Sequence, residues 1–385
     1  MTYAPGAGRP ARGRAAGGRA RHGAMDAGRG PQRAAGHDSG RAAGPGSGPL
    51  GILVLDKPPG LPSNRVLGQV KRLLGVTKMG FLGTLDPLAS GVLPVFVGRA
   101  TRLIPLFEGL WKTYRVTMKL GERTATFDAE GEVTERRPLD GLTPERVRAA
   151  ILAKAGRQRQ KVPAYSAVKV GGVPAYKLAR QGVPVPERVR DVELWDLAVE
   201  AIELPLATFR VTCTAGTYIR SLVEDLGLAL GPGAHVTALR RLACGGLFTL
   251  ADSVTLEGIG EAWKSGRMEG LRNPAEFLPE HAPLRVTPET ELLLRDGRTV
   301  LLELPAPGQL PNAVAGAAGA PRTGGAGDGA ADGSLDGAPG AGDWVAGQSV
   351  KALRSDGSLV AVGVVTAELP GAPQGRLGFR PTRVL

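Results

Sequence analysis

One carboxylate, that of Asp86, stands in the middle of a short segment in which glycine and proline constrain the backbone. The segment reads Gly80-Phe81-Leu82-Gly83-Thr84-Leu85-Asp86-Pro87-Leu88-Ala89-Ser90-Gly91. A carboxylate held by such a loop can attack a substrate carbon as a nucleophile and then leave again. An Asp followed by Pro also starts ordinary turns, so the residue types alone leave both interpretations open.

Motifs for other kinds of chemistry are missing from the sequence. There is no Gly-x-x-x-x-Gly-Lys-Ser/Thr phosphate loop, no Gly-x-Gly-x-x-Gly after a strand and no Gly-x-Ser-x-Gly nucleophile elbow. The histidines are scattered, and no spacing of His, Cys or carboxylates is typical of a metal site. We therefore expect a reaction at a single side chain, with no cofactor and no metal ion.

The composition favours a polyanionic partner. The chain has 385 residues, and its 48 basic residues outnumber 36 acidic ones, which gives a formal charge of +12. This charge favours nucleic acid but does not distinguish RNA from DNA or from a lipid surface. Two cysteines are too few for a disulfide framework and fit a reducing cytosol, so we expect a cytoplasmic protein. No apolar run approaches the ~20 residues of a membrane span.

Two segments are predicted to be disordered. Residues 1–50 contain thirteen glycines, and eight arginines against two aspartates give them a charge of +6, half of the total. Such a basic tail cannot bury enough apolar surface to offset the entropy lost on ordering. Residues 305–343 carry four aspartates and one arginine without periodicity, and we expect a disordered acidic insertion there.

The rest of the chain shows the apolar patterns of strands and helices. The pattern predicts apolar strands at residues 51–55 and 92–97, joined by a helix with Ser63 as its N-cap and by a loop at residues 78–91. Residues 112–120 alternate polar and apolar, as a half-buried antiparallel strand does. Further predictions are helices at 143–154 and 217–230 and strands at 209–213, 299–304, 349–354 and 359–365. Together they indicate an α+β fold on a mixed, largely antiparallel sheet, followed by a small β-rich domain.

Seven sequence blocks carry a resemblance to a known family. They read Gly51-Ile52-Leu53-Val54-Leu55-Asp56-Lys57-Pro58; Gly83-Thr84-Leu85-Asp86-Pro87-Leu88-Ala89-Ser90-Gly91-Val92-Leu93-Pro94; Lys112-Thr113-Tyr114-Arg115-Val116; Thr124-Ala125-Thr126-Phe127-Asp128-Ala129-Glu130-Gly131; Val162-Pro163-Ala164-Tyr165-Ser166-Ala167-Val168-Lys169 with Tyr176 and Ala179-Arg180-Gln181-Gly182; Gly216-Thr217-Tyr218-Ile219-Arg220; and Gly233-Ala234-His235-Val236-Thr237-Ala238-Leu239-Arg240-Arg241-Leu242. In order and spacing these blocks resemble the bacterial tRNA pseudouridine-55 synthases, the TruB type of pseudouridine synthase.

The resemblance implies a domain plan and an activity. It implies a catalytic domain at residues 51–284, with an RNA-gripping insertion and the following segment at about 124–182, and a PUA-like domain at 285–385. It also implies that uridine 55 in the TΨC loop of tRNA is flipped out and isomerised to pseudouridine. No cofactor and no obligatory protein partner is implied, and the enzyme is expected to act as a monomer.

The resemblance assigns roles to individual residues. Asp86 is the implied nucleophile, and Arg220 the cation that keeps it ionised although burial raises a carboxyl pKa. Tyr114 stacks on the flipped uracil, Tyr218 lines the pocket, and one of the two tyrosines helps to remove the C5 proton. Leu239 contacts the base through apolar surface. The family's usual Gly-His-Thr-Gly is replaced by residues 80–83 here, so Phe81 stands where a histidine contacts RNA, and its ring can still stack.

Each functional interpretation has a structural competitor. Tyr114 and Tyr218 can be ordinary packing residues, and Arg220 a surface residue near a helix start. The pairs Arg240-Arg241 and Lys71-Arg72 fit either the solvated face of a helix or phosphate contacts. At the level of the whole chain the alternatives are a related synthase acting on another RNA, such as the archaeal and eukaryotic enzyme guided by small RNAs, and a catalytically silent RNA-binding module or tRNA-folding chaperone.

Overall fold

The computed structural model describes residues 49–265, 268, 270–303, 312–314, 344–367 and 377–385. The predicted N-terminal tail lies outside the described residues, except for Pro49 and Leu50. Most of the predicted insertion at 305–343 also lies outside them, although the backbone of Asn312–Val314 is described as strand β16.

A nine-stranded sheet forms the centre of the larger part of the chain. Its main order is β1-β3-β12-β4-β11-β10-β7, with β2 paired to β3 and β13 to β12. The strands are β1 (Gly51–Lys57), β2 (Met79–Phe81), β3 (Ser90–Val97), β4 (Lys112–Leu120), β7 (Gly156–Lys161), β10 (Val189–Glu203), β11 (Leu206–Cys213), β12 (Ala234–Cys244) and β13 (Phe248–Thr249). Every pairing is antiparallel except the short one between β3 and β12, which confirms the mixed, largely antiparallel sheet.

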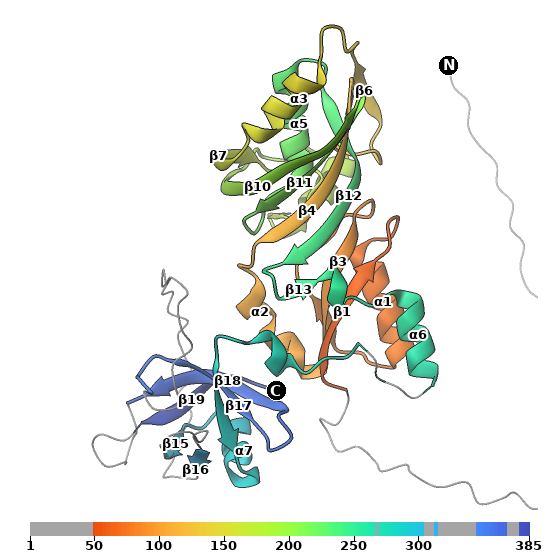
Figure 1. Cartoon of the computed structure of the whole chain (residues 1–385). Helices are drawn as coiled ribbons and strands as arrows, with labels where there is room; N and C mark the ends of the chain where they lie inside the picture. The colour runs from red at the N-terminus through yellow and green to blue at the C-terminus, as the bar shows by residue number, and fades with distance from the viewer. Residues whose placement is uncertain (1–48, 266–267, 269, 304–311, 315–343, 368–376) are drawn as a thin grey trace, which may run out of the picture. The chain divides into compact units, whose positions relative to one another are not determined.

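Helices cover one face of the sheet, where the largest apolar cluster lies, and strands β1 and β3 are buried on both faces. Figure 1 shows α3 (Pro144–Leu152) and α5 (Ile219–Leu230) beside the neighbouring strands β12, β4, β11 and β10, and α1 (Ser63–Leu74) beside α6 (Leu256–Lys264). The remaining short elements of this part are η1 (Gly98–Leu103), α2 (Ile104–Phe107), β5 (Glu122–Thr124), β6 (Val133–Arg136), β8 (Lys169–Val170), β9 (Val173–Pro174), α4 (Ala175–Arg180), η2 (Leu250–Asp252) and η3 (Pro274–Phe277).

Strand β4 illustrates why these residues form a half-buried strand. Its side chains alternate along the strand, and Tyr114, Val116 and Met118 are buried. They pack in one cluster with Phe209 of β11 and with Leu222 of α5. The intervening threonines and Arg115 point to the opposite face, as the period of two requires. The sequence-based prediction for residues 112–120 is confirmed.

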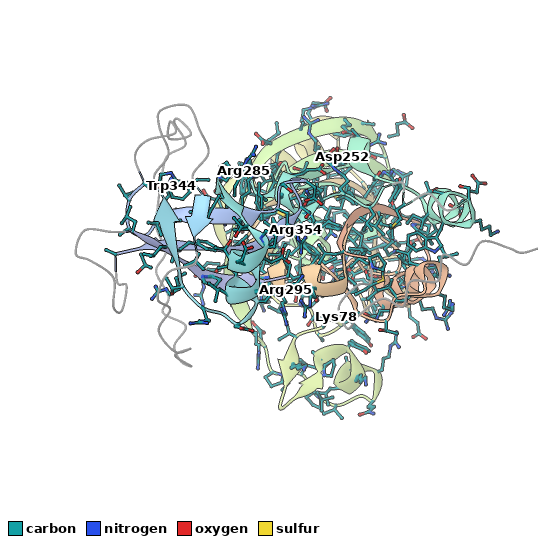
Figure 2. The ribbon with its side chains drawn as sticks, turned by 90° about the horizontal axis from the view of Figure 1, so that it is seen from below. Lys78, Asp252, Arg285, Arg295, Trp344 and Arg354 are labelled. Carbon is teal, nitrogen blue, oxygen red and sulfur yellow. The ribbon has the colours of Figure 1, made fainter. Side chains whose placement is uncertain are left out.

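The C-terminal residues form a small closed barrel, in agreement with the β-rich domain predicted from the sequence. Its order is β14-β16-β15-β19-β18-β17. The strands are β14 (Ala282–Val286), β15 (Val300–Glu303), β16 (Asn312–Val314), β17 (Ser349–Leu353), β18 (Leu359–Thr366) and β19 (Gly378–Val384), accompanied by helix α7 (Pro288–Arg295). Arg295 and Arg354, labelled in Figure 2, both pair with Glu291 of α7.

Several local predictions need correction. The N-cap position of α1 is Pro62, which makes no side-chain cap, and the hydroxyl of Ser63 bonds to Leu85 instead. The predicted loop at 78–91 contains β2 and the beginning of β3. Arg240 and Arg241 lie on strand β12 and not on a helix.

Candidate active site

Asp86 and Arg220 meet although 134 positions separate them in the sequence. Nε of Arg220 donates to Oδ2 of Asp86 at 2.9 Å, and Nη2 donates to Oδ1 at 3.4 Å. The guanidinium is buried, with its side chain 6 % exposed, whereas the Asp86 side chain is 39 % exposed. Because the planar guanidinium donates to both carboxylate oxygens, it fixes the orientation of the Asp86 carboxylate. Solvent and ligands can still reach that carboxylate.

Arg220 is itself held by backbone carbonyls of two other segments. Nη1 donates to the carbonyl of Thr126 at 2.8 Å, and Nη2 donates to the carbonyl of Tyr165 at 2.9 Å. A second carboxylate, that of the buried Asp128, lies 3.6 Å from Nε. Arg220 therefore joins the loop of Asp86 to the segments around residues 126 and 165, and the guanidinium has little freedom to move.

Two buried polar side chains, those of Lys57 and Ser63, hold the loop that carries Asp86 through hydrogen bonds to its backbone. The ammonium of Lys57 donates to the carbonyls of Pro58, Pro87 and Ala89 at 2.9, 3.2 and 2.6 Å. The hydroxyl of Ser63 donates to the carbonyl of Leu85 at 2.8 Å and accepts from the Leu85 amide at 3.0 Å. Residues on both sides of Asp86 are thus fixed, which holds the carboxylate in one position.

The backbone at position 91 shows why this segment needs a glycine there. Its φ is +98°, and a Cβ there would lie 2.2 Å from the backbone oxygen of Arg241. Only glycine permits both that backbone conformation and that approach. This close contact lies where β3 and β12 pair in parallel, with Gly91 opposite Arg241, so it brings the end of the Asp86 loop against β12.

A cavity of about 410 Å³ opens beside Asp86. Its lining includes all six residues that the sequence analysis singled out, namely Phe81, Asp86, Tyr114, Tyr218, Arg220 and Leu239. A volume of this size lies within the range typical of small-molecule pockets and suits a nucleobase with its sugar. The cavity is also lined by Glu108, Lys112 and Arg241, so it offers apolar surface and polar groups together beside the Asp86 carboxylate, as a base-binding pocket requires.

The two tyrosines have different surroundings. Tyr114 is 9 % exposed, and burial raises the pKa of its hydroxyl above the usual value, while the positive charge of Arg241 acts in the opposite direction. Tyr218 is half-buried; its amide donates to the side-chain oxygen of Gln160 at 2.7 Å, and the Arg190 guanidinium lies 5.5 Å from its ring centre. Leu239 is 7 % exposed.

The lysines near the site have altered acidity. Burial lowers the pKa of Lys57 from 10.5 to about 8, and the negative charges of Glu130 and Asp86 counter this only in part. Burial likewise lowers the pKa of Lys112, whose ammonium donates to the carbonyls of Glu108 and Leu110. Both lysines act as clamps on backbone carbonyls, which explains why they tolerate burial.

Sequence reasoning named no role for Asp128 or Lys57, and it misjudged Arg241. Asp128 and Lys57 both lie inside the matched blocks, so their presence there was the available signal. The solvated helix face offered for Arg241 is wrong, because the residue lies on strand β12 and its side chain is 1 % exposed. The phosphate contact offered for it stays a prediction. Arg240 is half-buried and pairs with Asp56 at 2.7 Å. Lys71 and Arg72 do lie on a helix, in the last turn of α1.

Across the described residues, no group of three or more His, Cys, Asp or Glu side chains is arranged to hold a metal ion. The helices in the same residues are also too short or too polar to cross a membrane.

Two family models match the chain over adjoining ranges. The N-terminal domain of the TruB family pseudouridylate synthases matches residues 71–219, and the tRNA pseudouridylate synthase B C-terminal domain matches residues 220–275. Asp86 lies in the first match, and Arg220 and Leu239 lie in the second.

Curated proteins and solved structures give similar matches. A tRNA pseudouridine synthase B from Syntrophotalea carbinolica is 44% identical over 239 residues, which cover 62% of this chain and 78% of that protein. Another from Burkholderia lata is 48% identical over 240 residues, which cover 62% and 74%. A chain from an H/ACA RNP bound to a substrate RNA containing 2′-deoxyuridine aligns with a TM-score of 0.55 at 24% identity, over 87% of this chain and 84% of that one. At that identity the last match bears on the fold alone.

Proposed function

This chain belongs to the TruB family of pseudouridylate synthases, and from that premise we propose that it isomerises uridine 55 in the TΨC loop of tRNA to pseudouridine, with Asp86 as the nucleophile. The observation that carries the proposal is the Asp86 carboxylate, held on both oxygens by Arg220 and exposed to a cavity of about 410 Å³.

The reaction breaks the bond from ribose C1′ to uracil N1 and makes a bond from C1′ to C5. The proton leaves C5 and N1 gains one, so no oxidant, reductant or metal ion enters the balance. Asp86 attacks the ribose or the uracil ring, stays attached while the base is repositioned, and is released when the C1′–C5 bond is complete. Because the carboxylate must be ionised to attack, its pairing with the Arg220 guanidinium supports this role.

The remaining cavity residues have roles that follow from their surfaces. Tyr114 stacks on the extruded uracil, and its hydroxyl helps to take the C5 proton. Tyr218 and Leu239 supply apolar walls on the other sides of the base. Phe81 fills the space that the base leaves in the RNA stack, which offsets part of the few kcal/mol that flipping costs.

We assign the rest of the protein to RNA binding. Residues 51–284 are the catalytic domain, and about 124–182 grip the RNA beside the pocket. Residues 285–385 are a PUA-like domain that contacts tRNA away from the reaction centre. The enzyme works as a monomer in the cytoplasm, without a cofactor or an obligatory protein partner.

Two alternatives make different predictions. A catalytically silent RNA-binding protein or tRNA-folding chaperone binds the T arm but leaves uridine unchanged. A synthase directed by a guide RNA modifies its target only when that guide is supplied. The carboxylate–guanidinium pair in the cavity favours catalysis over the first alternative.

A single assay separates these functions. Purified protein is incubated with an unmodified tRNA transcript, and pseudouridine is mapped at nucleotide resolution. The proposal expects one modified site, at position 55, without added RNA, protein or metal ion, and none in a transcript with cytidine at that position. A wild-type protein that binds the transcript but yields no pseudouridine would sink the enzyme assignment.

A further inference from the structure

Arg241 is among the largest fully buried side chains of the protein, with 1 % of its surface exposed. It lies on β12, directly opposite Tyr114 of β4, and lines the cavity that contains Asp86. Nothing in the roles given above uses it. A permanently charged group in such a position needs an explanation, because burying a charge without a counter-charge is costly.

The contacts of Arg241 leave its charge uncompensated. Nε donates to the carbonyl of Val92 at 2.7 Å, and Nη2 donates to those of Leu82 and Gly83 at 3.3 and 2.9 Å. These partners are neutral. Among the residues that the structure describes, no ion pair joins Arg241 to a carboxylate, whereas Arg220 in the same cavity has Asp86 and Asp128 beside it.

The third nitrogen of the guanidinium lies close to Gly83 of the Asp86 loop. Nη1 is 3.1 Å from the place that a Cβ on Gly83 would occupy, and Gly83 is exposed and lines the cavity. The charge is also close enough to the hydroxyl of Tyr114 to act on its acidity. A base stacked on Tyr114 therefore lies within the field of Arg241.

The proposed reaction creates a negative charge at that place. When Asp86 attacks the ribose and the bond from C1′ to N1 breaks, both electrons of that bond stay with the uracil ring, which becomes an anion delocalised over N1 and its carbonyl oxygens. The anion persists until C5 bonds to C1′, after which the C5 proton leaves. A fixed cation stabilises such a charge without reorganisation of its surroundings.

We propose that Arg241 is a further catalytic residue, whose buried guanidinium has no protein counter-ion because the uracil anion formed on cleavage of the C1′–N1 bond is its partner. The proposal rests on the proposed function and deepens it. Arg220 holds the nucleophile, and Arg241 stabilises the leaving group, so each of the two cavity arginines compensates a different negative charge.

The test compares two leaving groups. The enzyme is mixed under single-turnover conditions with T-arm hairpins that carry uridine or 5-fluorouridine at the target position. The measured quantity is the rate at which the C1′–N1 bond of that nucleotide breaks. Fluorine withdraws electrons and stabilises the uracil anion without help from the protein. The variants are Arg241→Gln, which removes the charge, and Arg241→Lys, which keeps a charge but loses the fork. The control is Arg210→Gln, which removes an exposed arginine from β11. The thermal unfolding of each variant is measured first.

The expected result is a loss that depends on the leaving group. Arg241→Gln lowers the rate with uridine by about 100- to 1,000-fold, as loss of a charge-stabilising donor does, but lowers the rate with 5-fluorouridine by roughly tenfold or less. Arg241→Lys keeps the wild-type ratio of the two rates, and Arg210→Gln changes neither rate.

Three results would overturn the inference. Arg241→Gln with an unchanged rate, or with equal losses on both substrates, would leave Arg241 a support of the Asp86 loop only. If Arg241→Gln does not fold, Arg241→Lys decides, and a fluoro-to-uridine ratio well above that of the wild type would refute the proposal. A wild-type enzyme inactive on uridine would instead contradict the proposed function, so the two failures are distinguishable.

Discussion

Replacement of Arg220 by lysine should slow the reaction while leaving RNA binding intact. The guanidinium makes four hydrogen bonds at once, two to Asp86 and one each to the carbonyls of Thr126 and Tyr165. The single nitrogen of lysine restores the charge, but it cannot span both carboxylate oxygens and two carbonyls from different segments. At least two of the four bonds are lost.

The size of the effect follows from those bonds. Hydrogen bonds from a charged donor contribute about 1.5–3 kcal/mol each. Because the Asp86 side chain is 39 % exposed, we take about 1–1.5 kcal/mol per lost bond, which allows for screening by water. Two lost bonds amount to about 2–3 kcal/mol, so kcat is expected to fall roughly 30- to 160-fold.

The assay is single-turnover pseudouridine formation at saturating enzyme, combined with equilibrium binding to the same hairpin. Binding should stay within about threefold of the wild type, because the lost contacts are not made to the RNA. The matched control is Arg354→Lys, since Arg354, labelled in Figure 2, donates to both carboxylate oxygens of Glu291 on α7 at 2.8 and 2.7 Å. Arg220→Lys with a wild-type kcat, or with its whole loss in binding, would show that the hydrogen bonds of Arg220 do not position the nucleophile.

Three further predictions concern the residues around Asp86. Tyr114→Phe keeps the ring and removes the hydroxyl, so kcat should fall about 100- to 10,000-fold with unchanged hairpin affinity if the hydroxyl takes the proton; a variant as fast as the wild type would limit Tyr114 to stacking. The pKa of Lys57 is lowered to about 8, so kcat should decline above that pH as the ammonium loses the charge that clamps the loop, and this decline should be absent from the profile of Lys57→Gln. Between pH 8 and 10.5 the unfolded chain binds more protons at Lys57 than the folded chain does. The free energy of unfolding should therefore rise with pH over this range, although activity falls. Phe81→Ala should weaken hairpin binding by about 5- to 150-fold, the loss expected for one base stacked on an aromatic ring, whereas Phe81→Tyr should bind like the wild type; equal affinity of the alanine variant would remove Phe81 from the RNA interface.

The local patterns of the sequence predicted the strands and helices well where burial follows a simple period. The alternation in residues 112–120 identified β4, and the spacing of apolar residues after Ser63 identified α1. In both cases one face of the element is buried by the sheet or by the helix layer. A period of two or 3.6 then records that burial directly in the sequence.

Such local patterns could not predict contacts between segments that are distant in the sequence. Ser63 has the residue type of an N-cap, but its hydroxyl serves Leu85, 22 positions later. The carbonyls that clamp Lys57 at Pro87 and Ala89 lie 30 and 32 positions away. The short parallel pairing of β3 with β12 also joins segments about 150 positions apart. None of these contacts produces a periodic pattern in the sequence around the residue that makes it.

Arg240 and Arg241 show how an ambiguous period misleads. Two adjacent arginines within an apolar stretch fit a helix face, and charged residues are rarely buried. On a strand, however, neighbours point to opposite faces, so one arginine is placed outward toward Asp56 and the other inward beneath the Asp86 loop. The sequence suggested one role for both arginines, whereas the fold places them on opposite faces of β12, in different surroundings.

The replacement Asp86→Asn is the sharpest check on Asp86 as the nucleophile, because it removes one negative charge and preserves the shape of the side chain. Wild type and variant are mixed in excess over an unmodified T-arm hairpin, and pseudouridine is quantified over time beside hairpin affinity. The variant should bind the hairpin fully and form no pseudouridine, since a neutral amide cannot act as the nucleophile. Pseudouridine formed by the variant at the wild-type rate would show that Asp86 is not the nucleophile.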